Sequence, residues 1–311
     1  MEFGIMTEPQ LGLTYDRLLA AARLAEDLGL EVLGRSDHLA YPRFDAPHAT
    51  EAFTTLAGLA RDTERIGLMV LVSPITFRHP ALIAKAAATI DEMSGGRFML
   101  GLGTGWLEKE HAAFGIPFPP WPERFARLEE ALRYLQAALG RGPAPVEGEH
   151  YHLAGRPVRP LPTGPLPIVV GGRGARRTPR LAGRYADEYN LTSLPVDELP
   201  GRIAEARAAA VEARRAPGEP TISFMGAAVT GPDQAAFRRN LEAVAAADPF
   251  GHSPAAIEAQ LRERGLPVGP GPEAREALAR LAGMGISRFY LQHLGPFEPR
   301  LLEETFAGLA G

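Results

Sequence analysis

Short apolar runs alternate with amphipathic segments along the whole chain. Ile66–Val72 is a nearly continuous apolar run, as a parallel strand buried on both faces requires. The stretch 16–28 instead spaces its leucines and alanines by three and four, which is typical of an amphipathic helix, and Gly29 follows as a stop. The pattern predicts eight strands, at Phe3–Met6, Glu31–Arg35, Ile66–Val72, Phe98–Leu102, Ile168–Val170, Tyr189–Leu191, Thr221–Val229 and Phe289–Leu291.

Helical segments separate these strands. Beyond 16–28 they are expected at Glu51–Thr63, Pro80–Met93, Pro122–Leu139, Arg176–Tyr185, Asp197–Arg215 and Glu273–Met284. Strands that alternate with helices imply right-handed crossovers and a parallel sheet. Eight such units in a chain of this length fit a closed (β/α)₈ TIM barrel, expected as a single domain over residues 1–311. An open doubly wound sheet remains the alternative, because periodicity does not separate the two.

Two segments exceed a minimal barrel. Residues 140–167, after the fourth strand and its helix, are rich in Pro and Gly and contain Val146–Leu153, which is predicted to form a hairpin insertion. Residues 246–272, in the C-terminal third, carry several prolines and are expected to make a long excursion over one rim. Long loops in compact domains are commonly functional. We expect these two segments and the loop at 40–50 to shape a substrate pocket.

Composition narrows the class of protein. The 311 residues contain no cysteine and carry a formal net charge of −4. Cysteine nucleophiles, Cys-ligated zinc, iron–sulfur clusters and disulfides are therefore excluded. The slightly acidic balance argues against a nucleic-acid partner. Residues 1–6 do not resemble a secretory signal, and no stretch approaches the roughly 18 apolar residues of a membrane helix, so no membrane partner and a cytoplasmic location are expected.

Candidate acid–base chemistry follows the second strand, at Ser36-Asp37-His38. In a barrel, catalytic groups lie where strands end on the C-terminal face. Histidine exchanges protons near neutral pH, and an adjacent carboxylate can fix its tautomer or stabilise its charged form. We predict that His38 is the catalytic acid or base and that Asp37 orients it. A loop histidine beside a helix-capping aspartate is the structural alternative.

A glycine-rich turn follows the fourth strand, at Gly101-Leu102-Gly103-Thr104-Gly105-Trp106. Glycines allow the backbone to approach a ligand closely, and Thr104 adds a hydroxyl. The spacing is GxGxG rather than GxGxxG, and the acidic residue expected about 20 positions further on is missing. A Rossmann nicotinamide site is therefore disfavoured.

A second glycine-rich turn follows the fifth strand and opens a helix, at Gly171–Thr178. Three glycines and three arginines coincide there. Free N–H groups at a helix start, together with guanidinium groups, make an anion site, and phosphates commonly bind on this rim of a barrel. The segment predicts phosphate binding, with a solvated basic helix face as the alternative.

Other candidate sites are weaker. His150 and His152 would project to the same side of a strand, but no third metal ligand is evident, so no metal is expected. Glu110 and His111 lie in a predicted short helix and are interpreted as a surface pair. Arg78-His79-Pro80 either lines the pocket or caps a helix. No G-x-S-x-G elbow suggests a serine hydrolase.

Taken in order, these segments resemble the bacterial luciferase-like flavin and deazaflavin oxidoreductases. The resemblance covers nearly the whole chain. It is carried by Ser36-Asp37-His38, by Phe77–Asp91, by Ser94–Phe98 followed by Gly101–Trp106, by Phe114–Pro117, by the Gly171-Gly172 turn and by Tyr185–Asp187. The GTGW and EHxxFGIP stretches are similar to the deazaflavin-dependent branch.

The resemblance implies a (β/α)₈ barrel that binds coenzyme F420, or alternatively FMN, at its C-terminal mouth, and a homodimer. A non-proline cis peptide is implied near Val70-Leu71. The coenzyme phosphate is expected at the loop Gly171–Gly174, in agreement with the anion site inferred above. The cofactor-binding residues so implied are Val70, Leu71, Gly103, Thr104, Gly105, Trp106, Gly171, Gly172, Arg173, Gly174 and Arg177.

One residue departs from the family pattern. In the family's sugar-phosphate dehydrogenases a glutamate follows GTG, whereas this chain has Trp106, which cannot exchange a proton. The resemblance therefore implies an oxidoreductase that transfers a hydride between F420 and an unidentified organic small molecule with an apolar or aromatic-lined pocket. The alternatives are an FMN-dependent monooxygenase, a non-catalytic flavin-binding protein and a metal-dependent barrel hydrolase.

Overall fold

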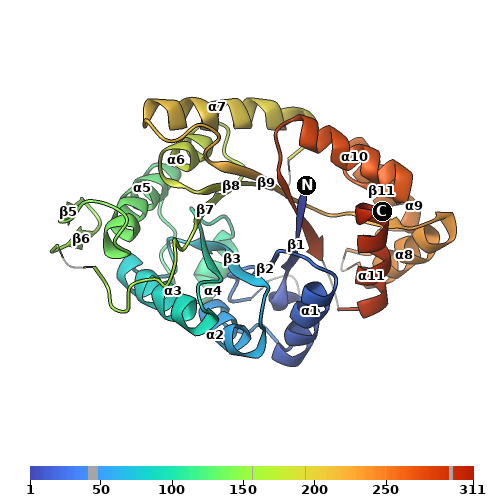
Figure 1. The fold of residues 1–311 in the computed structure, drawn as a ribbon, viewed down its shortest axis with the longest axis horizontal. Helices are drawn as coiled ribbons and strands as arrows, with labels where there is room; N and C mark the ends of the chain where they lie inside the picture. The colour runs from blue at the N-terminus through green and yellow to red at the C-terminus, as the bar shows by residue number, and fades with distance from the viewer. Residues whose placement is uncertain (41–47, 156, 193, 249, 294–296) are drawn as a thin grey trace.

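The computed structural model describes residues 1–40, 48–155, 157–192, 194–248, 250–293 and 297–311. Within these ranges, eight parallel strands close into a barrel in the order β1-β12-β9-β8-β7-β4-β3-β2 (Figure 1). They are β1 Glu2–Thr7, β2 Val32–Arg35, β3 Gly67–Pro74, β4 Phe98–Gly103, β7 Ile168–Gly171, β8 Glu188–Thr192, β9 Thr221–Gly226 and β12 Arg288–His293. The TIM barrel prediction is confirmed. The open sheet is wrong, because β1 pairs with both β2 and β12.

Helices cover the outside of the barrel (Figure 1). They include α1 Tyr15–Asp27, α2 Ala52–Asp62, α3 Pro80–Ser94, α5 Trp121–Ala138, α6 Arg177–Tyr185, α7 Leu199–Glu212, α10 Gly271–Gly283 and α11 Pro299–Ala310. Local signals set their starts: the Thr14 hydroxyl accepts the Arg17 N–H, and Pro80 takes the first position of α3. Among the described residues, no helix combines the length and apolar character needed to cross a bilayer.

The additions to the barrel follow the fourth and seventh barrel strands along the chain. A short helix, α4 Glu108–Ala113, follows β4, and the predicted hairpin forms from β5 Val146–Glu147 and β6 His152–Leu153. The predicted strand Thr221–Val229 is wrong as one element: β9 ends at Gly226, and β10 Val229–Gly231 pairs instead with β11 Val268–Pro270.

The C-terminal third also holds α8 Gln234–Ala247 and α9 Pro254–Glu263. The excursion predicted at 246–272 thus contains the helix α9 and the strand β11. The prolines of this segment are compatible with a helix, since Pro254 occupies the first turn of α9. The Ser253 hydroxyl caps the same helix by accepting the Ala256 N–H.

The core has two shells, because alternate residues of each strand face inward and outward. In β3, Met69 and Leu71 belong to the cluster inside the barrel, whereas Leu68 and Val70 pack with the surrounding helices. The inner cluster consists of Met6, Val32, Met69, Leu71, Met99, Val169, Met225 and Tyr290, with Val72 packed against it. This cluster fills the interior of the barrel. Its members nearest the C-terminal end of the barrel form the floor of a cavity.

Candidate functional site

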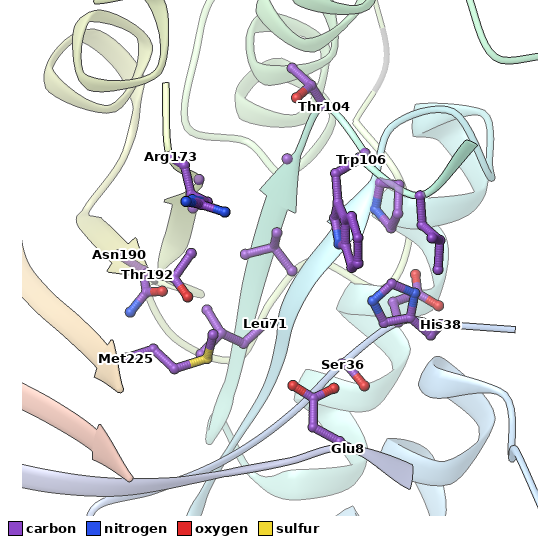
Figure 2. Close-up of a pocket in the computed structure, with 18 of the residues that line it drawn as sticks. Glu8, Ser36, His38, Leu71, Thr104, Trp106, Arg173, Asn190, Thr192 and Met225 are labelled. Atoms are coloured by element: carbon purple, nitrogen blue, oxygen red, sulfur yellow. The ribbon is translucent and has the colours of Figure 1, made fainter. Parts of the chain in front are cut away.

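The C-terminal end of the barrel holds a cavity of about 750 Å³. Its walls come from residues at or just after the carboxyl ends of the strands, as the fold requires. Met6, Leu71 and Met225 give it an apolar floor. Figure 2 shows polar and aromatic side chains around that floor, with Glu8, Ser36 and His38 on one side and Arg173 on another.

His38 lines the cavity and is held from behind by a buried carboxylate. Its Nδ1 lies 2.9 Å from Glu110 Oε2, and the other Glu110 oxygen accepts the backbone N–H groups of Leu39 (2.6 Å) and Ala40 (3.1 Å). Burial favours neutral His38, but the hydrogen bond and charge of Glu110 outweigh it, so the pKa of His38 lies above its ordinary 6.5. With Nδ1 bound to Glu110, Nε2 is the nitrogen left for proton exchange.

Asp37 does not orient His38, contrary to the prediction. Its carboxylate accepts hydrogen bonds from Ser73 Oγ (2.7 Å) and from both terminal nitrogens of Arg78, and Arg78 also pairs with Glu51. The physical reason is tertiary: the fold brings Ser73 and Arg78 to Asp37, and Glu110 to His38, from distant parts of the chain. Asp37 therefore joins the loop after β2 to β3 and the start of α3.

A second buried arginine supports the same loop. Arg35 donates to the carbonyls of Ser36 and Thr50 and to the Thr55 hydroxyl. Burial lowers the pKa of Arg35 to about 10. These bonds tie both ends of the segment after β2 to α2, and thereby fix the backbone that carries His38.

The glycine-rich turn after β4 is clamped from two sides. Arg124, in α5, donates to the Gly105 carbonyl (2.6 Å) and to the Pro119 carbonyl (2.8 Å), and its guanidinium stacks on Trp121 and Phe118. Gly105 has a φ of +76°, which favours glycine, and a side chain there would press against Thr76 Oγ1. The turn thus presents backbone to the cavity in a fixed shape.

The sequence suggested that Glu110 and His111 form a surface pair, but the structure buries both residues. Both are about 1% exposed. The His111 Nε2 lies 2.7 Å from Thr76 Oγ1, and its ring packs against Phe77 and Phe118. The helix α4 directs these two residues inward: Glu110 bonds to the loop after β2, and His111 packs against Phe118 from the segment before α5.

The turn after β7 is open and basic. Gly171–Gly174 lines the cavity, and a Cβ on Gly174 would lie 2.4 Å from Thr178 Oγ1, so the backbone passes close to the start of α6. Arg173 is exposed and forms no hydrogen bond or ion pair with the described residues. The first turn of α6 begins beside it with the N–H groups of Arg177 and Thr178, whereas Pro179 has no N–H and the Arg180 N–H bonds to the Arg176 carbonyl. Glycines, a helix start and an unpaired guanidinium are the components of an anion site.

Most, but not all, of the predicted cofactor-binding residues line the cavity. Leu71, Gly103, Thr104, Gly105 and Trp106 line the cavity, as does the whole turn Gly171–Gly174. Val70 does not, because it faces the outer shell of the core. Nor does Arg177, whose guanidinium lies over the Phe125 ring at 5.5 Å. The non-proline cis peptide is Leu71-Val72, one bond beyond the predicted Val70-Leu71. Val72, which was not predicted, lines the cavity.

The predicted variable loops contribute unequally. From 246–272, Phe250 lines the cavity, whereas no residue of 140–167 within the described chain does, because the β5–β6 hairpin packs against α5. Of the loop 40–50, residues 41–47 lie outside the described residues. Across the described ranges, no group of three His, Asp or Glu side chains is arranged to hold a metal ion, and His152 pairs with Glu147 instead.

Sequence reasoning missed Glu8, Gln10, Glu110, Arg124 and Gln292. Glu8 and Gln10 follow β1, and Gln292 is the last residue but one of β12; all three line the cavity. Their signal was available, since each is a polar residue at the carboxyl end of a predicted strand. Glu110 and Arg124 gave no such signal, because their roles depend on contacts with residues 72 and 19 positions away.

Comparison with known proteins shows which family the chain resembles in sequence. The family model described as luciferase-like monooxygenase matches residues 1–291. An F420-dependent glucose-6-phosphate dehydrogenase of Microbacterium testaceum is 37% identical over 185 residues, which are 59% of this chain and 54% of that protein. The chain therefore spans about half the length of the curated relatives it matches.

Solved structures share the fold. An F420-dependent secondary alcohol dehydrogenase in complex with an F420–acetone adduct superposes with a TM-score of 0.80 at 19% identity, covering 99% of this chain and 98% of that one. The monooxygenase RslO1 from Streptomyces bottropensis also gives 0.80, at 21% identity, covering 98% and 96%. At these identities the likeness shows the architecture alone.

Proposed function

The chain belongs to the luciferase-like monooxygenase family, and from that premise we propose that it is an oxidoreductase that binds coenzyme F420 and exchanges a hydride with an organic small molecule. The names of the relatives support the coenzyme, since the protein from Microbacterium testaceum is F420-dependent. The alternative coenzyme is FMN, which the description of the family as monooxygenases favours.

One observation carries this proposal: a single cavity is lined both by a glycine-rich basic turn at a helix start and by a histidine whose Nδ1 is bonded to a buried glutamate. The turn Gly171–Gly174 lines one side and the His38–Glu110 pair lines another. An anion site alone would suit many phosphate ligands, and a histidine alone would suit many hydrolases. The two together fit an anionic coenzyme whose reaction also moves a proton.

The residues present fit that coenzyme in space and in donor chemistry. A cavity of about 750 Å³ has room for a tricyclic ring and a substrate. The Arg173 guanidinium and the backbone N–H groups of Arg173 and Gly174 would hold the phosphate, because the Gly172 N–H already donates to the Asn190 carbonyl. Gly103–Gly105 with Leu71 would border the ring. When bound, the deazaflavin supplies two-electron hydride chemistry.

The chain's own contribution is proton handling and exclusion of water. His38 Nε2 faces the cavity and can take a proton from the substrate or return one, while Glu110 keeps the proton on Nδ1. The carboxylate also stabilises the charged imidazolium as it forms. Trp106 packs edge-on to His38 at 5.7 Å and gives the ring a second, apolar wall.

The coenzyme is tested by parallel titrations with F420 and FMN. Both of the chain's tryptophans, Trp106 and Trp121, line the cavity, so intrinsic fluorescence reports on its occupancy. We expect F420 to quench this signal and to bind at least about tenfold more tightly than FMN, as one additional charge-assisted contact would produce. Clear preference for FMN overturns the coenzyme assignment and favours the monooxygenase.

Hydride exchange separates an enzyme from a binding protein. We expect reduced or oxidised F420 to turn over with some members of a panel of alcohols and carbonyl compounds. Tight binding without exchange with any donor or acceptor would support the non-catalytic alternative. The homodimer and the cytoplasmic location stay predictions of this proposal, the first of which sedimentation analysis checks.

A further inference from the structure

The cavity has a second polar pole, at Glu8, which lies across the barrel from the anion site. In the strand order β1-β12-β9-β8-β7-β4-β3-β2, β7 stands four places from β1 in either direction. Glu8 follows β1 and Arg173 follows β7, so a carboxylate and a guanidinium face one cavity from opposite walls (Figure 2). His38 follows β2, next to β1, and therefore lies on the Glu8 side.

Glu8 is held by neutral donors rather than by a cation. Gln10 Nε2 donates to Glu8 Oε2 (2.6 Å) and Gln292 Nε2 donates to Glu8 Oε1 (3.0 Å). Ser36 Oγ fixes Gln10 by donating to its Oε1 (2.6 Å). A carboxylate has about four lone-pair sites, so each Glu8 oxygen keeps an acceptor position after these bonds.

The other carboxylates of the cavity are already neutralised, which sets Glu8 apart. Asp37 is paired with Arg78, and Glu110 with His38 and two backbone N–H groups. Glu8 forms no ion pair with the described residues, and the buried Arg35 nearby is bonded to Ser36, Thr50 and Thr55 instead. The negative charge of Glu8 is therefore available to a ligand.

Positive charge is scarce on the same side. Among the described residues that line the cavity, Arg173 is the one arginine or lysine, and it stands at the opposite wall. Arg124 and Arg78 lie close by but are engaged with carbonyls and carboxylates. His38, on the Glu8 side, is paired with Glu110, and the buried Arg35 is bonded to Ser36, Thr50 and Thr55. A second anionic group, on a substrate, would thus meet Glu8 with no unpaired cation among the described lining residues of that side to offset the repulsion.

We propose that Glu8 selects the substrate: it accepts a hydrogen bond from a hydroxyl or amine donor and rejects anions, so the substrate is an apolar molecule that carries such a donor and no phosphate or carboxylate. The proposal rests on the proposed function for the position of the coenzyme at Arg173. It sets this chain apart from a sugar-phosphate dehydrogenase, which is what the names of its relatives describe. The apolar body would pack against Met6, Leu11 and Trp106.

The test uses one apolar body with four head groups: cyclohexanol, its methyl ether, cyclohexylammonium and cyclohexyl phosphate. Each is titrated by tryptophan fluorescence into the protein alone and into the protein with F420. We expect the donor-bearing probes to bind at least about tenfold more tightly than the ether and the phosphate, the size of a hydrogen bond to a charged group. Whichever donor binds more tightly, the alcohol or the amine, identifies the head group of the substrate.

Two variants of Glu8 separate its charge from its hydrogen bond. Glu8→Gln should reduce the preference for alcohol over ether by about tenfold and tighten binding of the phosphate ester. Glu8→Asp keeps the negative charge, but its shorter side chain places the carboxylate further from the ligand. This variant should still reject the phosphate while losing part of the preference for the alcohol. Glu2→Gln, at the other end of β1, is the matched control and should leave all four affinities unchanged.

The proposal is overturned if wild-type protein binds the phosphate ester as tightly as the alcohol, if the alcohol does not bind, or if Glu8→Gln leaves the selectivity intact. Circular dichroism and the F420 titration accompany each variant. A variant that still binds F420 normally but has lost selectivity supports the role of Glu8. Failure of F420 to bind the wild type contradicts the proposed function instead, and the titrations without coenzyme still decide the role of Glu8.

Discussion

The two sides of the cavity mouth use charge in opposite ways. On the side built by β2, β3 and α4, charged groups are bonded to one another, as in His38 with Glu110 and Asp37 with Arg78. On the side built by β7 and α6, Arg173 is exposed, and no carboxylate among the described residues pairs with it. The carboxylates of the first side are about 1% exposed.

This difference follows from what each side must do. A group that exchanges a proton needs a fixed position and a defined pKa, and buried partners supply both. A group that binds an anion must not already hold one, and an exposed guanidinium stays accessible to the ligand. The paired side is therefore suited to proton transfer and the unpaired side to ligand binding.

The largest expected effect is on the paired side. His38→Asn should lower turnover by about 10³-fold, since general acid–base groups contribute in this range, while the Kd for F420 stays close to that of the wild type. Steady-state kinetics and fluorescence titration measure the two quantities. His152→Asn, on the exposed hairpin, is the matched control. Unchanged turnover in His38→Asn would remove the proton role from this residue.

Glu110→Gln should lower turnover by about 10²-fold, because it imposes the wrong tautomer on His38. The backbone N–H groups of Leu39 and Ala40 require an acceptor at their position, so the Gln amide must turn its NH₂ toward His38 Nδ1. The proton then resides on Nε2, which faces the cavity. Glu108→Gln, exposed on the same helix, should have no effect.

The pH dependence of the same pair has a definite sign. The pKa of His38 is raised in the folded protein, so the pair adds stability that is fully present below pH 6.5 and is lost as pH rises through the folded pKa. In Glu110→Gln, the pKa of His38 should fall. Histidine NMR titration and urea unfolding as a function of pH measure these changes. An unaltered His38 titration in the variant would contradict the pairing.

A smaller effect is expected on the unpaired side. Arg173→Ala should weaken F420 binding by about tenfold, as loss of a charge-assisted bond to phosphate predicts, and should reduce the salt dependence of the Kd. Turnover at saturating coenzyme should change little. Arg180→Ala, in the helix α6 that follows Arg173 and paired with Glu205, is the control. Equal effects of the two substitutions would show only a general influence of positive charge.

Asp37→Asn should affect stability more than chemistry. Arg78 would lose the charge of its bidentate partner and keep only Glu51, so the free energy of unfolding should fall by about 2 kcal/mol. Urea unfolding checks the loss, and turnover at low temperature should remain near that of the wild type. A collapse of turnover in a stable protein would restore Asp37 to a direct role beside His38.

Sequence patterns were sufficient for the barrel and for the unpaired side. Continuous apolar runs such as Ile66–Val72 mark strands buried on both faces, and the glycines and arginines of 171–177 are adjacent in the chain. Local sequence therefore contains nearly all residues of the proposed anion site. The sequence also predicted Arg177 in the cavity. The structure instead places the Arg177 guanidinium over the Phe125 ring, outside the cavity lining.

The paired side was predicted only in part, because its partners are distant in sequence. Adjacent letters suggested Asp37 as the partner of His38, whereas closure of the barrel brings Glu110 there from 72 positions away. The same holds for Glu8, which Gln292 contacts only because β12 pairs with β1. A single sequence shows which residues follow strands but not which of them meet across the mouth.

A crystal structure of the protein with bound F420 tests the division between the two sides most directly. The account predicts the phosphate against the backbone N–H groups of Arg173 and Gly174 and the Arg173 guanidinium, with the ring over Leu71 and within reach of His38. A phosphate bound elsewhere, or a ring outside this cavity, would contradict it.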